Sequence, residues 1–332
     1  MFSGFRSCPF YSLLIFPFLV ILSCSKLEKN EFALWMESED KLKVLSTTAM
    51  IDSLVKKIGG NHVSSLVLIK GDLDPHSYEM VKGDGEKIDI ADIVFYNGLG
   101  LEHAPSLIYK LHNSSKAVAL GDKIKDAEPD EIIYVDGQVD PHVWMDISLW
   151  QKAVPLILEQ MVQGDPKNTV EYEKNAKNLL EDMQKSHAEV HEILQSIPPQ
   201  KRYLVTGHDG FHYFVRAYFS ESDERNKQTW FERFQAPEGL APQAQISMID
   251  LREVLDFVAK HKIEVLFPES NLNNDSIIKM ISAGREMGLN IRLAKAALYS
   301  DALGAKGSGA EEYLDMLLHN AKTISEHLKE RF

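Results

Sequence analysis

The chain has 332 residues, of which 44% are hydrophobic, and a formal net charge of −13 at neutral pH. This length allows one large or two medium domains once a terminal leader is set aside. The acidic balance argues against a nucleic-acid partner and suits a protein that binds small cations.

The N-terminus has the features of a secretory leader. Arg6 precedes a mostly apolar run from Phe10 to Leu22, and the tetrapeptide Ile21-Leu22-Ser23-Cys24 resembles the lipobox of bacterial lipoproteins. The run is shorter than the roughly 20 residues that a membrane span needs, and Pro17 interrupts it. We therefore expect a signal peptide over residues 1–23 rather than an uncleaved membrane anchor.

Cys24 is the expected site of lipidation. Cys8 leaves with the signal peptide, so the mature chain is expected to contain no disulfide and no further thiolate ligand. Residues 24–41 carry alternating charges and few apolar positions, which indicates a tether between lipid and domain. The acyl chains would anchor the protein to a membrane in the periplasm or another extracytoplasmic space.

Short β-branched runs alternate with longer helix-like segments through the rest of the chain, as in parallel sheets with helical crossovers. We expect an α/β fold of two lobes, each with a parallel β-sheet flanked by helices. The predicted strands of the N-terminal lobe, residues 42–164, are Lys43–Ser46, Ser65–Ile69, Ile93–Tyr96 and Ala117–Leu120. Those of the C-terminal lobe, residues 198–332, are Tyr203–Thr206, Ile263–Phe267 and Ile291–Ala294.

A long helix is predicted between the two lobes, over residues 165–197. Asp165-Pro166 offers an N-cap residue followed by proline in the first turn, and Pro198-Pro199 ends the segment. About 30 residues at 1.5 Å each would extend roughly 45 Å, which is enough to run along both lobes. A continuous helix is stiffer than the paired strands of a hinge, so we expect the lobes to tilt little when a ligand binds.

One tripeptide occurs twice, at Asp74-Pro75-His76 and at Asp140-Pro141-His142. Proline fixes the backbone just before each histidine, which reduces the loop entropy lost when a ligand binds. The aspartates can accept backbone N–H bonds, as they do in Asx turns. The simpler interpretation, that Asp-Pro is only a turn dipeptide, does not account for the repeated histidine.

Four candidate metal ligands come from distant segments of the chain: His76, His142, His208 and Asp301. Ligands of open parallel sheets bind beyond the carboxyl ends of the strands, so we expect these four side chains to meet in the cleft between the lobes. Each histidine alone would be an ordinary surface or capping residue. Three imidazoles and one carboxylate together are typical of a site for a divalent transition metal.

Other titratable residues have weaker interpretations. Glu269 follows a predicted strand and is expected to orient an imidazole, although a fifth ligand and a helix cap are alternatives. His187 and His191 have the spacing of zinc-protease ligands, but the acid between them is misplaced and they lie in the predicted long helix. His212 is expected to lie on a helix face, and His103 has no assigned role.

Six stretches of the chain carry a resemblance to a known family. They are Gly71–Glu79, Ala91–Glu102, Asp140–Asp146, Thr206–Phe214, Phe267–Ser270 and Leu298–Gly304. From about Lys43 to the C-terminus the chain resembles the TroA-like, or cluster A-I, solute-binding lipoproteins of ABC transporters for zinc, manganese and iron. The resemblance implies two α/β lobes joined by one long helix, with the metal between them.

The resemblance also implies a function. The protein would be a receptor, expected to be a monomer, that carries Zn, Mn or Fe as cargo to an ABC permease and its ATPase without catalysing a reaction. Its ligands would be His76, His142, His208 and Asp301. Residues 121–139 contain no histidine, unlike the loop of many zinc-specialised members, so a zinc-only assignment is not favoured. The alternatives are a metal-dependent hydrolase with Glu269 as its base and a surface adhesin with a structural metal.

Overall fold

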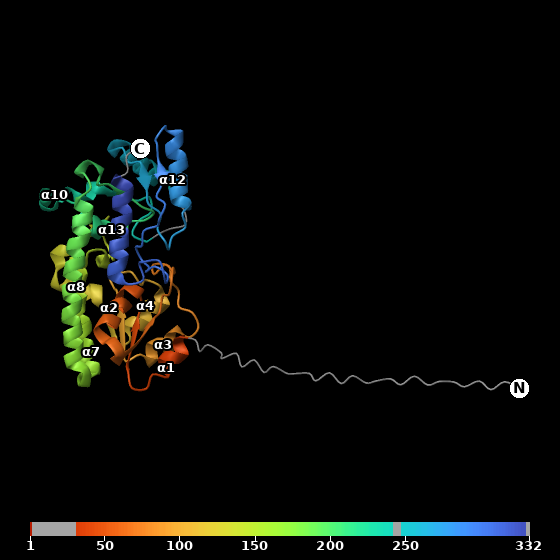
Figure 1. The fold of residues 1–332 in the computed structure, drawn as a ribbon, viewed down its shortest axis with the longest axis vertical. Coiled ribbons are helices and arrows are strands. Elements are labelled where there is room, and N and C mark those ends of the chain that lie inside the picture. Colours follow the sequence, from red (N-terminus) through yellow and green to blue (C-terminus); the bar gives the residue numbers. More distant parts are fainter. Residues whose placement is uncertain (2–30, 242–246, 330–332) are drawn as a thin grey trace.

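The structure is a computed structural model that describes residue 1 and residues 31–241 and 247–329. Two lobes are stacked along the long axis of the molecule, with the N-terminal lobe at the bottom of Figure 1 and the C-terminal lobe at the top. The predicted signal peptide and Cys24 lie outside the described residues. Within the described ranges, none of the helices combines the length and apolar character that a membrane crossing requires.

The N-terminal lobe is built on a four-stranded parallel sheet with the order β2-β1-β3-β4. Its central strands are almost completely buried, as is usual when helices cover both faces of a parallel sheet. All four predicted strands are present, and β2 begins two residues earlier than predicted. The strands are β1 (Leu42–Ser46), β2 (Val63–Val67), β3 (Ile93–Tyr96) and β4 (Ala117–Ala119).

Helices surround this sheet, and one of them lies in the segment that the sequence predicts as a tether. Trp35 of α1 is buried, and its Nε1 donates a hydrogen bond of 2.9 Å to the carbonyl of Ser64 on edge strand β2. Helix α1 therefore packs against edge strand β2 of this lobe. The helices are α1 (Glu31–Met36), α2 (Ala49–Gly59), α3 (Asp84–Ile90), α4 (Pro105–His112), α5 (Leu120–Ala127), α6 (Ile147–Trp150) and α7 (Ala153–Gly164), with short 3-10 turns η1 (Gly60–His62), η2 (Pro129–Glu131) and η3 (Val143–Met145).

A small antiparallel hairpin, absent from the sequence prediction, leads into the second Asp-Pro-His segment. Strands β5 (Tyr134–Val135) and β6 (Gln138–Val139) pair across a two-residue turn. Asp136 and Gly137 both have positive φ, 50° and 79°, which is the backbone of a tight hairpin turn. The Asp-Gly dipeptide was the available signal for this hairpin.

The helix between the lobes is α8 (Thr169–Gln195), preceded by the 3-10 turn η4 (Pro166–Asn168). The α-helix begins four residues later than predicted because Asp165 accepts hydrogen bonds from the side chains of Asn168 and Tyr172 instead of capping the helix. Its 27 residues extend about 40 Å.

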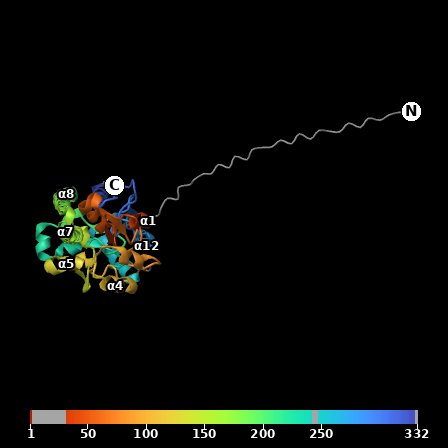
Figure 2. The same cartoon turned by 90° about the horizontal axis from the view of Figure 1, so that it is seen from below.

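Helix α8 contacts both lobes. It packs on α2 and α7 of the N-terminal lobe and on α9 (His212–Tyr218) and α13 (Tyr313–Lys329) of the C-terminal lobe. Seen along the long axis, α8 lies at one side of the molecule beside α7 (Figure 2). The fold is therefore the predicted one, with two α/β lobes and a long helix along them.

The C-terminal lobe has shorter strands than predicted, arranged as two parallel pairs. A hydrogen bond of 3.0 Å from the Phe267 amide to the Val205 carbonyl joins the pairs side by side. The strands are β7 (Leu204–Val205), β8 (Phe234–Gln235), which was not predicted, β9 (Val265–Leu266) and β10 (Arg292–Leu293). The remaining helices are α10 (Ser222–Lys227), α11 (Met248–His261) and α12 (Asp275–Glu286), with 3-10 turns η5 (Pro199–Lys201) and η6 (Thr229–Arg233).

Buried polar bonds tie the two lobes together around a shared hydrophobic core. Trp144 of the N-terminal lobe donates from Nε1 to the Ser300 carbonyl at 2.7 Å, and its own carbonyl accepts from Tyr313 at 2.6 Å. The Tyr218 hydroxyl accepts from the Ile147 amide at 3.1 Å. These bonds hold the loops of the two lobes at fixed positions relative to each other.

Candidate metal centre

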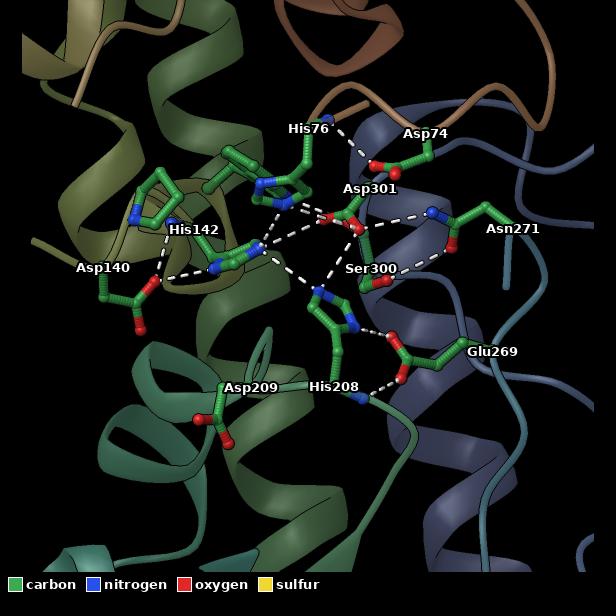
Figure 3. Close-up of polar contacts among 12 residues, drawn as sticks. Asp74, His76, Asp140, His142, His208, Asp209, Glu269, Asn271, Ser300 and Asp301 are labelled. Carbon is green, nitrogen blue, oxygen red and sulfur yellow. Dashed lines mark hydrogen bonds and ion pairs between the residues drawn. The ribbon is translucent and has the colours of Figure 1, made fainter. Parts of the chain in front are cut away.

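The four predicted ligands converge at the junction of the lobes (Figure 3). His76, His142, His208 and Asp301 are all buried, and one donor atom from each lies within 4.8 Å of the others. His76 lies in the loop after β2 and His142 between β6 and η3. His208 follows β7, and Asp301 lies in the loop after β10. Segments separated by more than 200 residues thus meet at one point.

The separations of the donor atoms match the size of a metal ion. The Nε2 atoms of His76 and His208 lie 3.1 and 3.3 Å from Nε2 of His142. The nearest Asp301 oxygens are 3.4 Å from His142, 3.3 Å from His208 and 4.0 Å from His76. A tetrahedral ion with bonds of 2.0–2.1 Å has ligand atoms about 3.3–3.4 Å apart. The arrangement therefore needs only small adjustments to hold such an ion.

The two Asp-Pro-His segments share one local bond. The Asp74 carboxylate accepts a hydrogen bond of 2.9 Å from the His76 amide, and Asp140 accepts one of 2.9 Å from the His142 amide. Both are Asx-type turns, as the sequence predicts. Asp140 makes a second contact, at 2.7 Å, with Nδ1 of His142. That contact places a ring proton on Nδ1 and directs Nε2 at the centre.

Glu269 makes the corresponding contact with His208. Its Oε2 lies 2.8 Å from Nδ1 of His208, and its Oε1 accepts from the amides of Gly207 and His208 at 2.9 and 3.0 Å. The sequence interpretation of Glu269 as the residue that orients an imidazole fits this geometry. Gly210 was not singled out, yet a Cβ atom there would lie 2.6 Å from the ring of His208. A glycine is needed at this position because the ring packs directly on the backbone.

Asp301 has a different partner, which the sequence interpretation missed. The side-chain amide of Asn271 donates from Nδ2 to Oδ2 of Asp301 at 3.3 Å. Oδ1 of Asp301 is buried and has no hydrogen-bond partner among the described residues. An unpartnered buried carboxylate oxygen is costly, and a bound cation would compensate for that cost. The position of Asn271, two residues after Glu269 on the same loop, was the available signal.

The two histidines of the repeated tripeptide have opposite pKa shifts. Burial lowers the pKa of His76 to about 3, because the nearby charge of Asp301 offsets only part of the desolvation. Burial also lowers the pKa of His142, but the charges of Asp140 and Asp301 outweigh it and raise the pKa to about 9. The Asp140 contact at Nδ1 thus gives the two histidines different pKa values although their tripeptides have the same sequence.

The two cluster residues of the C-terminal lobe, His208 and Asp301, have strongly shifted pKa values. Burial disfavours the charged form of His208, but Glu269 and Asp301 outweigh it and hold its pKa well above the ordinary value. Burial likewise opposes ionisation of Asp301, yet His208 and His142 hold its pKa well below the ordinary range. The neighbouring imidazoles therefore favour the anionic form of Asp301.

The other histidines lie outside this cluster. His212 is the first residue of α9. Its Nδ1 lies 3.3 Å from Oδ2 of Asp140 and does not face the cluster. His187 and His191 lie in α8, as predicted, and Nδ1 of His187 is 3.2 Å from the Tyr218 hydroxyl. His103 is exposed. None of the four contributes a donor atom to the cluster.

The cluster has the dimensions of an ion site rather than a pocket for an organic molecule. Cavities of about 600 and 500 Å³ are present elsewhere, and none of the four residues lines them. His142 and His208 are completely buried, and His76 is 4% exposed. A ligand at this point would be enclosed by side chains on all sides, which favours a single desolvated cation.

Comparison with known proteins gives consistent results. The family described as ZnuA, zinc-uptake complex component A periplasmic, matches residues 44–327. The metal-binding protein YtgA of Chlamydia muridarum is 39% identical over 93% of this chain and 91% of its own length. The manganese-binding lipoprotein MntA of Bacillus subtilis is 31% identical over 88% of this chain and 91% of its own length. The crystal structure of Fe(III)-bound YtgA from Chlamydia trachomatis superposes with a TM-score of 0.82 at 38% identity, covering 87% of this chain and 98% of that one.

Proposed function

We propose a function from the premise that this chain belongs to the family of zinc-uptake complex component A periplasmic proteins. The protein is an extracytoplasmic receptor that binds one divalent transition-metal ion with high affinity and delivers it to an ABC permease for import. It makes and breaks no covalent bond in its cargo. Relatives described as binding metal, manganese or iron support this class of cargo.

The observation that carries the proposal is the enclosed cluster of three imidazoles and one carboxylate. We assign His76, His142, His208 and Asp301 as the metal ligands. The Nε2 lone pairs of His142 and His208 point inward because Asp140 and Glu269 hold the opposite ring nitrogens. Asp301 supplies the negative charge, so the desolvated divalent ion is partly neutralised by the protein.

The cargo is Zn, Mn or Fe. Imidazole suits zinc and iron, while carboxylate oxygen also suits manganese, so this mixed donor set can hold all three. Affinity in vitro rises toward zinc whatever the cell supplies, because that order follows from the ions themselves. The metal acquired in the cell therefore depends on availability and on the coordination geometry that the protein imposes.

The location follows from the N-terminal sequence. Cleavage before Cys24 and lipidation of its thiol would anchor the protein to a membrane, and the manganese-binding relative from Bacillus subtilis is itself described as a lipoprotein. The partners would be the permease and its ATPase. We expect the receptor to act as a monomer, because the long helix and the shared core complete the two-lobe unit within one chain.

The hydrolase alternative loses its candidate base in this geometry. One oxygen of Glu269 accepts from two backbone amides, and the other lies 2.8 Å from Nδ1 of His208, so both oxygens are already engaged by the protein. The adhesin alternative would be supported if adhesion persisted without the four ligands while metal uptake was unaffected. No contact in the site favours that alternative.

Elemental analysis of the protein isolated from its own membrane, without added metal, tests the proposal. We expect about one equivalent of zinc, manganese or iron per chain, and loss of the metal in Asp301→Ala. His112→Ala, which removes an exposed imidazole on α4, is the matched control and should retain the ion. Metal-free wild-type protein, or metal retained by Asp301→Ala, would contradict the proposal.

A further inference from the structure

The loop after β9 carries two side chains that reach different ligands of the cluster. Glu269 contacts His208, and Asn271, two residues later, contacts Asp301 (Figure 3). The amide of Ser270 between them donates to the Leu298 carbonyl at 2.9 Å, which ties this loop to the segment that carries Asp301. The role of Glu269 follows a common arrangement at metal sites. The role of Asn271 does not follow from the sequence.

The hydroxyl of Ser300 orients the side-chain amide of Asn271. Its Nδ2 donates to Oδ2 of Asp301 at 3.3 Å, while its Oδ1 accepts from the Ser300 hydroxyl at 3.4 Å. Ser300 is completely buried, so its hydroxyl cannot bond to bulk water instead. A hydroxyl donor at the amide oxygen leaves the NH₂ group facing the carboxylate.

This contact fixes the rotation of the carboxylate of Asp301. Oδ1 lies 3.4 Å from Nε2 of His142, and Oδ2 lies 3.3 Å from Nε2 of His208, so both oxygens face the imidazoles. The torsion that rotates a carboxylate is broad and has little intrinsic preference. A donor on one oxygen therefore decides whether one or both oxygens meet the ion.

We propose that Asn271 is a positioning residue that holds Asp301 with both oxygens toward the cation and thereby sets the choice among metals. The ion would then be coordinated by three imidazole nitrogens and by both oxygens of Asp301. The inference rests on the proposed function, because it concerns the same site. Zinc prefers four ligands, whereas manganese favours more oxygen donors, so the fifth donor favours manganese relative to zinc.

The test is the same substitution at two positions of one loop. Asn271→Ala removes the donor, and Asn274→Ala, at an exposed position with no side-chain cap bond, is the control. Dissociation constants for Mn²⁺ and Zn²⁺ are measured by competition titration, and X-ray absorption of the loaded proteins gives the coordination number. We expect the ratio Kd(Mn)/Kd(Zn) to rise about tenfold in Asn271→Ala. The coordination number should fall by one, with Asn274→Ala unchanged.

Ser300→Ala provides a second variant that keeps the Asn271 side chain and frees its orientation. It should change the same ratio in the same direction by about threefold, since only the alignment of the donor is lost. Equal weakening of both metals, or an unchanged coordination number in both variants, overturns the proposal. Wild-type protein that binds neither metal would instead contradict the proposed function, so the two failures can be told apart.

Discussion

The two lobes hold their halves of the cluster in different ways. In the N-terminal lobe each histidine amide is bound by an aspartate two residues earlier. In the C-terminal lobe the supporting residues are distant in sequence, since Glu269 is 61 residues from His208 and Asn271 is 30 residues from Asp301. The cluster residues of the N-terminal lobe are therefore positioned by local turns, and those of the C-terminal lobe depend on contacts between distant segments.

The two Asp-Pro-His segments show that local sequence does not decide the chemistry of the ring. Asp140 contacts the His142 ring as well as its backbone amide, whereas Asp74 accepts a hydrogen bond from the His76 amide. Their pKa values accordingly differ, about 3 for His76 and about 9 for His142. The difference comes from the Asp140 carboxylate, which lies 2.7 Å from Nδ1 of His142 and raises the pKa of that ring.

The largest effect is expected from pH. Protons compete with the metal for Nε2, so metal affinity falls as pH falls. The charges of Asp140 and Asp301 raise the pKa of His142 to about 9, and Glu269 and Asp301 raise the pKa of His208 in the same direction, so a metal ion that binds at pH 7 displaces protons from the site. Binding should release at least about one proton per ion at pH 7, and affinity should rise about tenfold or more per pH unit there.

Calorimetry in buffers of different ionisation enthalpy measures this proton release. His76, with its pKa lowered to about 3, contributes no proton in this range. A release near zero at pH 7, with affinity already constant above that pH, would mean that the rings titrate near the ordinary value of about 6.5. That outcome would remove the contrast between His76 and the other two ligands.

The second effect compares one histidine from each lobe. His208→Ala leaves the buried carboxylate of Glu269 without its imidazole, and breaking a buried ion pair costs about 3 kcal/mol. His76→Ala leaves no carboxylate that close to the lost ring, since its nearest acid is Asp301 at 4.0 Å. We expect a loss of about 1 kcal/mol for His76→Ala.

Urea unfolding of the metal-free variants at pH 7 gives these free energies. Both variants should keep the fold and lose at least about tenfold in metal affinity, because each removes one donor. Equal destabilisation by His76→Ala and His208→Ala would show that the contact of His208 with Glu269 adds no stability beyond what His76 contributes.

The smallest effect separates the two aspartates of the repeated tripeptide. Asp140→Asn removes the charge that holds Nδ1 of His142, and metal affinity should fall about tenfold. Asp74→Asn keeps an oxygen that can accept from the His76 amide, and affinity should fall by no more than about threefold. Competition titration with a chelating dye measures the metal affinity of both variants. Similar losses of affinity would show that both aspartates only hold the backbone of their loops.

Much of the fold and the four converging residues could be predicted from the sequence because the signals are local and repeated. Alternating β-branched runs predicted the N-terminal sheet, and the tripeptide with two further strand-end residues predicted the cluster. The predicted two-lobe architecture with one long helix is confirmed.

The misses concern short elements and long-range contacts. Strands of two residues, such as β5 and β8, are too short to show alternation. Trp35 is buried in a hydrophobic cluster with residues that are distant in the sequence, such as Leu66 and Ile88. The contact between Asn271 and Asp301 was missed, since the two residues are 30 positions apart in the sequence. Such contacts are decided by packing and not by the local pattern.

The central claim is that one cation is held by donors from both lobes. Anomalous X-ray diffraction from crystals of the metal-loaded protein, collected on both sides of the metal absorption edge, tests it directly. We predict a single strong peak about 2.0–2.3 Å from Nε2 of His76, His142 and His208 and from the Asp301 carboxylate. A peak elsewhere on the protein, or a loaded crystal with these four side chains pointing apart, would contradict the claim.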